Sequence, residues 1–132
     1  AMPRNHRWAG REDVAWSELA GQRLVSVSRD SANRLLLDQA TADLPERPVA
    51  WYECNHVAGA LALVEAGLGL AVLPHFLARQ AGLVCVEPQL GADQPIWLAM
   101  HADLAHSRRV RAVADHLIEL FERRHAELEG PA

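Results

Sequence analysis

The fold of this chain is decided by residues 51–76, which read WYECNHVAGALALVEAGLGLAVLPHF. An alternating segment ends at Cys54, and a helical pattern continues from there to Ala66. The apolar residues of that pattern recur on one helical face, at Val57, Ala60, Leu61 and Val64. Gly67 stands where a helix commonly ends in a left-handed residue, and a second apolar strand follows at 70–73. A strand, a helix and a strand in so short a span predict a βαβ unit, and therefore a parallel sheet covered by helices.

The segments on either side predict further units of the same α/β domain. Apolar patterns predict strands at residues 24–28, 49–53, 83–87 and 96–101. Helical patterns predict one turn at 16–21, a helix capped by Asp30 or Ser31, a short helix at 75–80 and a long C-terminal helix capped by Ser107. The long helix has apolar residues on one face, at Val110, Val113, Ala114, Leu117 and Phe121. The remaining stretches predict an extended basic lead-in and two loops, at residues 3–11, 43–48 and 88–95.

Composition narrows the class of protein. A chain of 132 residues, half of them apolar, suits one compact domain with a modest core. Its net charge of -4 gives no general attraction for phosphate backbones, so this part of a protein is not expected to grip DNA. Cys54 and Cys85 follow no metal or pairing pattern, which is typical of a reducing compartment. Since no signal peptide and no apolar run of membrane-spanning length are present, we expect a cytoplasmic protein with no membrane partner.

Polar side chains gather in the loops that follow the predicted strands. In an open parallel sheet, ligands bind beyond the carboxyl ends of the strands, which here lead into residues 28–31, 54–56 and 74–75. Each of these loops precedes a helix, whose first N–H groups attract a carboxylate or a phosphate. The candidate ligand-binding residues, which offer a guanidinium fork, hydroxyls and side-chain donors, are Ser28, Arg29, Ser31, Asn55 and His56. They predict a site for a small anionic ligand.

The same residues also have simpler explanations, which the sequence leaves open. Asp30, Ser31 and Asn55 are ordinary helix N-caps. Arg29 can pair with a surface carboxylate, and a histidine at a helix start, such as His56, is more often solvent-facing than functional.

Signatures of enzymes are weak. The chain has no G-x-S-x-G elbow, P-loop, H-E-x-x-H or G-x-G-x-x-G motif. The glycines at 67 and 69 follow a helix and precede a strand, the reverse of a dinucleotide-binding turn, so they predict close packing. Cys54 and His56 are the residues from which a metal site or a nucleophile and base could be built, but no second pair of ligands accompanies them. We therefore expect no metal, no cofactor and no catalytic residue.

Several short motifs occur in a fixed order along nearly the whole chain. They are PRNH at 3–6, VAWSELAG at 14–21 leading into 24–29, Asn55, LVEAGLGLAVLP at 63–74, WLAMH at 97–101 and SRRVRAV at 107–113. In this order and spacing the chain resembles the effector-binding regulatory domain of LysR-type transcriptional regulators. Two local departures are His6-Arg7-Trp8 in place of His-Pro-Leu, and Ser107-Arg108 in place of Ser-Pro.

The resemblance implies a periplasmic-binding-protein-like fold of type II, with two α/β subdomains around a cleft. Residues 14–90 correspond to the second subdomain, and residues 95–132 to the return crossing and C-terminal helix of the first. The first half of the regulatory domain and the N-terminal winged helix-turn-helix domain are expected to be absent from this sequence. The cleft-lining role is carried onto Ser28, Arg29, Asn55 and His56, within the loops that the strand-end reasoning selects.

The function implied is that of an effector-sensing segment of a DNA-binding transcriptional regulator, without catalysis. Its expected partners are a small-molecule effector, further copies of itself in a homodimer or tetramer, and DNA only through the absent winged helix-turn-helix domain. Two alternatives remain open. One is a solute-binding protein of the same fold that serves transport and would carry a secretion signal. The other is a small α/β enzyme that uses Cys54 and His56.

Overall fold

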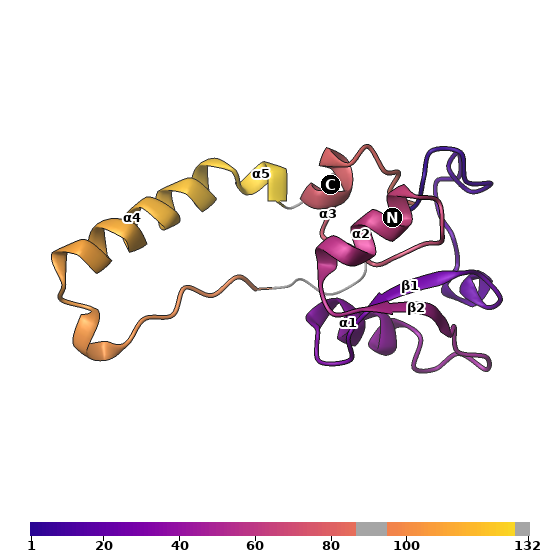
Figure 1. Cartoon of the computed structure of the whole chain (residues 1–132), viewed down its shortest axis with the longest axis horizontal. Helices are drawn as coiled ribbons and strands as arrows, with labels where there is room; N and C mark the ends of the chain where they lie inside the picture. The colour runs from indigo at the N-terminus through magenta and orange to yellow at the C-terminus, as the bar shows by residue number, and fades with distance from the viewer. Residues whose placement is uncertain (87–94, 129–132) are drawn as a thin grey trace.

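Two parallel strands lie at the centre of the fold (Figure 1). In the computed structural model, which describes residues 1–86 and 95–128, β1 (Leu24–Val27) pairs in parallel with β2 (Ala50–Cys54). On the other side of β1, Leu24 forms a parallel bridge with Leu70. The expected α/β architecture with a mostly parallel sheet is confirmed.

The N-terminus adds an antiparallel segment to this sheet. Ala1 and Ala71 exchange two hydrogen bonds, of 2.6 and 3.1 Å, and Met2 forms an antiparallel bridge with Val84. Within the described residues, each of the strands predicted at 70–73 and 83–87 is therefore reduced to a single bridge. Residue 87, and residues 88–94 of the loop predicted at 88–95, lie outside the described residues.

Helices cover both faces of the sheet because β1 alternates its side chains between two cores. Leu24 faces the first core cluster, which includes Leu37 of α1 (Ala32–Ala40). Val25 faces the second core cluster, which includes the fully buried Val64 of α2 (Val57–Glu65). The members of the first cluster are Met2, Trp8, Leu24, Leu37, Leu70 and Val86. Those of the second are Val25, Val27, Ala60, Val64 and Ala71.

The short elements predicted from turn residues are found where they were expected. The turn η1 (Trp16–Leu19) ends shortly before Gly21, and α3 (His75–Gln80) ends shortly before Gly82. Both glycines have positive φ, of 74° and 69°, as does Gly67 at 77° after α2. These conformations cost little for glycine and more for any residue with a Cβ, so glycine is favoured at the three positions where these helical elements end.

The prediction of an extended lead-in is wrong. Residues 3–11 fold into successive turns, in which the N–H groups of His6, Ala9 and Arg11 donate to the carbonyls three residues earlier at 2.9 to 3.0 Å. These turns place Trp8, only 6% exposed, in the first core cluster. Burial of a large ring outweighs the basic composition of the surrounding segment, since the neighbouring guanidiniums stay at the surface.

The strand predicted at 96–101 is also wrong. Within the described residues this stretch has no ladder partner, and its side chains from Ile96 to Met100 are exposed, with Trp97 at 84%. A strand exists only where a second strand satisfies its backbone groups, so the apolar pattern alone does not produce one here. After it come η2 (Ala102–Leu104), α4 (Arg108–Arg123) and α5 (His125–Leu128).

The long C-terminal helix is confirmed, but most of it lies away from the sheet. Figure 1 shows residues 95–107 running outward, α4 running back, and α5 returning beside α3. The predicted apolar face of α4 has only Ala114 buried, while Val113 is 60% exposed. We call residues 95–123 the C-terminal arm. Of the described helices, including α4, none is long and apolar enough to cross a membrane.

Candidate functional site

The two loops that hold the candidate residues lie side by side at the carboxyl ends of β1 and β2. The last residues of the strands, Val27 and Cys54, are paired. Just beyond them, the N–H of Ser28 donates to the carbonyl oxygen of Cys54 at 2.8 Å. This bond joins residues 28–31 to residues 54–56, and we call the two loops together the rim.

Within the first loop, Ser31 rather than Asp30 caps α1. The N–H of Ser31 donates to the Ser28 carbonyl at 2.9 Å, and its hydroxyl oxygen accepts from the N–H of Arg34 at 3.2 Å. Asp30 is exposed, and a hydrogen bond from the Ser28 hydroxyl, with a further one from its own backbone N–H, lowers the pKa of its carboxyl. Asp30 therefore carries a full negative charge near neutral pH beside the exposed guanidinium of Arg29.

The second loop presents two exposed side chains, those of Asn55 and His56. His56 occupies the N-cap of α2, but its side chain makes no capping hydrogen bond. Arg29, Asn55 and His56 are thus open to solvent at the rim, whereas Ser28 and Ser31 are half-buried and already hold the first loop in shape. Next to the negative charge of Asp30, the rim can offer an anion one guanidinium, an amide and an imidazole.

The segment that leads into the third predicted loop, at 74–75, is hydrogen-bonded to α1. The side-chain amide of Asn33, 8% exposed, donates to the carbonyl oxygen of Val72 at 3.2 Å. Pro74 is the N-cap of α3 and offers no side-chain donor. The side chain that this loop can offer to a polar site is therefore that of His75, which is half-buried.

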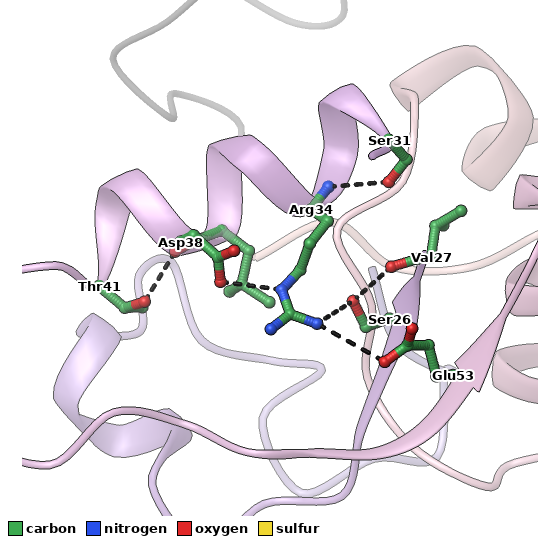
Figure 2. Close-up of polar contacts among 8 residues, drawn as sticks. Ser26, Val27, Ser31, Arg34, Asp38, Thr41 and Glu53 are labelled. Atoms are coloured by element: carbon green, nitrogen blue, oxygen red, sulfur yellow. Dashed lines mark hydrogen bonds and ion pairs between the residues drawn. The ribbon is translucent and has the colours of Figure 1, made fainter. Parts of the chain in front are cut away.

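Sequence reasoning missed Arg34, which lies under the rim in the first turn of α1. Figure 2 shows its guanidinium between Asp38 of the same helix and residues of both strands. Arg34 Nε donates to Asp38 Oδ1 at 2.8 Å, and Nη1 to Ser26 Oγ at 3.4 Å. Nη1 also lies 3.9 Å from Glu53 Oε2. Only the spacing of Arg34 and Asp38, one helical turn apart, was visible in the sequence, and that spacing usually marks an exposed pair.

Ser26 is a polar residue buried in β1. Residues 24–28 alternate apolar and polar, a pattern that often accompanies a strand with one solvated face. All four residues of β1 are nevertheless buried, and Ser26 is 4% exposed. Its hydroxyl donates to the carbonyl oxygen of Val27 at 2.9 Å and accepts from Arg34. The buried hydroxyl therefore has hydrogen-bond partners both as donor and as acceptor.

The geometry gives little support to chemistry by Cys54 and His56. Cys54 is a half-buried free thiol that packs against the second core cluster. A Cβ built on Gly59 of α2 would lie 3.6 Å from its Sγ, so the thiol faces the helix. His56 is exposed in the loop. Among residues 1–86 and 95–128, no group of three His, Cys, Asp or Glu side chains is arranged to hold a metal ion.

The cap of α1 leads to a first prediction. Substitution Ser31→Ala removes the oxygen that accepts from the N–H of Arg34, and it should lower the free energy of unfolding by about 1 kcal/mol. Ser107→Ala is the matched control, because Ser107 occupies the N-cap of α4 without a side-chain capping bond. Urea unfolding followed by circular dichroism measures both. Equal losses in the two variants would contradict the assignment of Ser31 as the cap.

Comparison with known proteins finds a family whose sequence model, described as LysR substrate binding domain, matches residues 1–122. The chain is also similar to a protein of Escherichia coli (strain K12) named "Uncharacterized HTH-type transcriptional regulator YbhD". The two are 39% identical over 94 residues, which cover 67% of this chain and 30% of that protein. A second relative, from Bacillus subtilis (strain 168), is named "Uncharacterized HTH-type transcriptional regulator YybE". It is 30% identical over 73 residues, which cover 55% of this chain and 25% of that protein. The chain thus spans less than a third of the length of these relatives.

Proposed function

This chain belongs to the family of LysR substrate-binding domains, and from that membership we propose that it senses an effector for a DNA-binding transcriptional regulator. The fold is periplasmic-binding-protein-like, with a parallel sheet flanked by helices and a C-terminal helix. In such a regulator an effector acts by favouring one arrangement of subdomains and protomers over another. The protein is proposed to work in the cytoplasm and to contact DNA through a separate helix-turn-helix domain.

The proposed effector is a small anionic metabolite that binds at the rim. The observation that carries this proposal is the hydrogen bond from Ser28 to Cys54, which brings Arg29 and Asn55 to the same edge of the sheet. A guanidinium can hold a carboxylate at two points, and Asn55 can donate to a further oxygen. The net charge of the chain does not attract anions, so the attraction has to come from these local groups.

The remainder of the site is proposed to come from the other half of the regulatory domain. We assign residues 14–90 to the second subdomain, and residues 95–132 to the return crossing and C-terminal helix of the first. The exposed apolar side chains of the C-terminal arm, among them Trp97 and Val113, are what such an assignment requires, because further elements of the first subdomain would cover them. A ligand held by the rim alone would have polar contacts that stay exposed to water, and it would bind weakly.

Self-association is proposed for the same reason. In this chain alone, packing of the exposed α4 face against a second copy would remove apolar surface from water. Homodimers or tetramers are proposed for the whole regulator. Light scattering at rising concentration is the measurement, and a clean monomer throughout would count against this part of the proposal.

Two other functions fit the observations less well. A solute-binding protein for transport would share the fold, but the relatives in the comparisons are named as transcriptional regulators. An enzyme that uses Cys54 and His56 would need the thiol and the imidazole to face a common substrate, whereas the thiol packs toward α2 and the imidazole is in solvent. No observation favours the transport protein or the enzyme over the proposed regulator.

Calorimetry on the full-length regulator tests the proposed site. The probes are inorganic sulfate, acetate and succinate, which sample a tetrahedral anion, a monocarboxylate and a dicarboxylate. For any probe that binds, Arg29→Ala and Asn55→Ala should each raise Kd by about tenfold or more, since a charge-assisted or amide hydrogen bond is lost. Arg108→Ala, which removes an exposed arginine on α4, should leave Kd unchanged. Unaltered affinity in both rim variants would refute the assignment of the site.

A further inference from the structure

We propose that Arg34 is a positioning residue that locks the two rim loops to each other, so that the ends of β1 and β2 and the start of α1 move as one unit. The contacts that support this are independent of any ligand. The statement that the unit serves effector recognition rests on the function proposed above.

The guanidinium of Arg34 contacts all three elements of this unit. It binds Asp38 on α1 at 2.8 Å, Ser26 on β1 at 3.4 Å, and it lies 3.9 Å from Glu53 on β2 (Figure 2). The backbone N–H of the same residue donates to the Ser31 hydroxyl at 3.2 Å. A single residue therefore connects the cap of the first loop to the penultimate residue of each strand.

A second arginine in the chain shows that this is more than an ordinary helical ion pair. Arg111 and Asp115 on α4 have the same spacing of four residues and a similar distance of 3.0 Å. Their side chains are 53% and 54% exposed, and within the described part of the chain Arg111 has no hydrogen bond or ion pair to a residue of the sheet. The side chain of Arg34 is only 19% exposed. Solvent screens the Arg34 contacts less, so their loss should have a larger and more local effect.

Locking the rim matters because it fixes the relative positions of Arg29 and Asn55. These exposed side chains lie on different loops, and the hydrogen bond from Ser28 to Cys54 is what joins the loops beyond the strands. If the loops separated, a ligand would have to order them on binding and would lose affinity. Arg34 thus acts on ligand binding through the loops and without touching the ligand.

Amide hydrogen exchange followed by NMR tests the lock directly. In Arg34→Met the side chain keeps its length and loses its charge, and exchange of the Ser28 amide should become about tenfold faster. The Val25 amide, which donates to Leu70 at 2.7 Å inside the sheet, should change by about twofold or less. Arg34→Lys keeps the charge without the fork and should restore part of the protection at Ser28. Arg111→Met is the matched control and should change neither amide.

Two results would overturn the proposal. One is an unchanged exchange rate of the Ser28 amide in Arg34→Met. The other is an equal acceleration of exchange at Ser28 and Val25, which would mean that Arg34 supports only global stability.

The Arg34→Met variant should fold, because Asp38 and Glu53 are about half exposed and can be solvated when the guanidinium is lost. Ser26→Ala keeps the question decidable if it does not fold, and it should accelerate Ser28 about threefold with Val25 unchanged. Chemical-shift changes of the rim amides with sulfate are recorded on the unmodified chain, so a failure of anion binding is distinguished from a failure of the lock.

Discussion

Replacing Gly69 with alanine is expected to destabilise the chain more than any other exchange of a single glycine that we consider. An added Cβ would lie 2.2 Å from the carbonyl oxygen of Arg23, 3.0 Å from its carbonyl carbon and 3.2 Å from Cγ2 of Val25. These atoms belong to the segment that begins β1, and the adjacent residue, Leu70, is hydrogen-bonded to it. Backbone atoms cannot move aside as a flexible side chain can. The sheet would have to separate between β1 and residue 70, at a cost of about 3 kcal/mol or more.

Two other glycines provide graded controls for this prediction. Gly67 has a φ of 77° and no atom within 4 Å of a built Cβ, so Gly67→Ala should cost about 1 to 2 kcal/mol from backbone conformation alone. Gly10 likewise has no atom within 4 Å of a built Cβ, but its φ is not positive, so Gly10→Ala should be close to neutral. Urea unfolding monitored by circular dichroism gives all three values. A Gly69→Ala variant as stable as Gly10→Ala would show that residue 70 is not held against β1 as the structure has it.

The βαβ unit could be predicted from sequence because its signals are local. The face of α2, the glycine that ends it and the strand before it all lie within residues 51–76. The close packing predicted for the glycines at 67 and 69 is found at Gly69, but Gly67 has no atom within 4 Å of a built Cβ. The sequence did not reveal that Gly69 packs against the backbone of Arg23, because that contact joins segments far apart along the chain.

The parts that could not be predicted depend on distant partners. The apolar pattern at 96–101 is as strand-like as that of β2, but only β2 has a neighbour, β1, to complete its hydrogen bonds. For the same reason, among the described residues, those at 70–73 and 83–86 keep only one bridge each. Local composition indicates that a segment can be a strand, and pairing decides whether it becomes one.

The candidate site also has one part that could be predicted from the sequence and one part that could not. That the two loops meet at one edge follows from parallel pairing, so the neighbourhood of Ser28 and Asn55 was accessible to sequence reasoning. The contribution of Arg34 was not, because its guanidinium contacts residues of both strands. Whether Arg29 and Asn55 contact an effector stays a prediction, and the calorimetric comparison proposed above tests it.

Truncation of Trp8 to alanine is the second large effect that we expect. Trp8 is 6% exposed and belongs to the first core cluster, which joins residues far apart in the sequence, such as Met2 and Val86. The guanidiniums of Arg7 and Arg11 lie 5.1 and 6.0 Å from the centre of its ring and add a cation–π contribution. Removing the ring leaves a cavity that the rigid turns around it cannot fill. The free energy of unfolding should therefore fall by about 3 to 5 kcal/mol, which is a large fraction of the stability of a domain of this size.

Trp97→Ala is the control that separates burial from residue type. Trp97 is 84% exposed on the C-terminal arm, so the same truncation should change the stability of the monomer by about 0.5 kcal/mol or less. Trp8→Phe should recover part of the loss, because it keeps most of the apolar volume. Urea unfolding at low protein concentration is the measurement, since self-association would otherwise contribute to stability. If Trp8→Ala and Trp97→Ala were equally mild, the turns at residues 3–11 would not close the first core cluster, and the extended lead-in predicted from composition would be the better description.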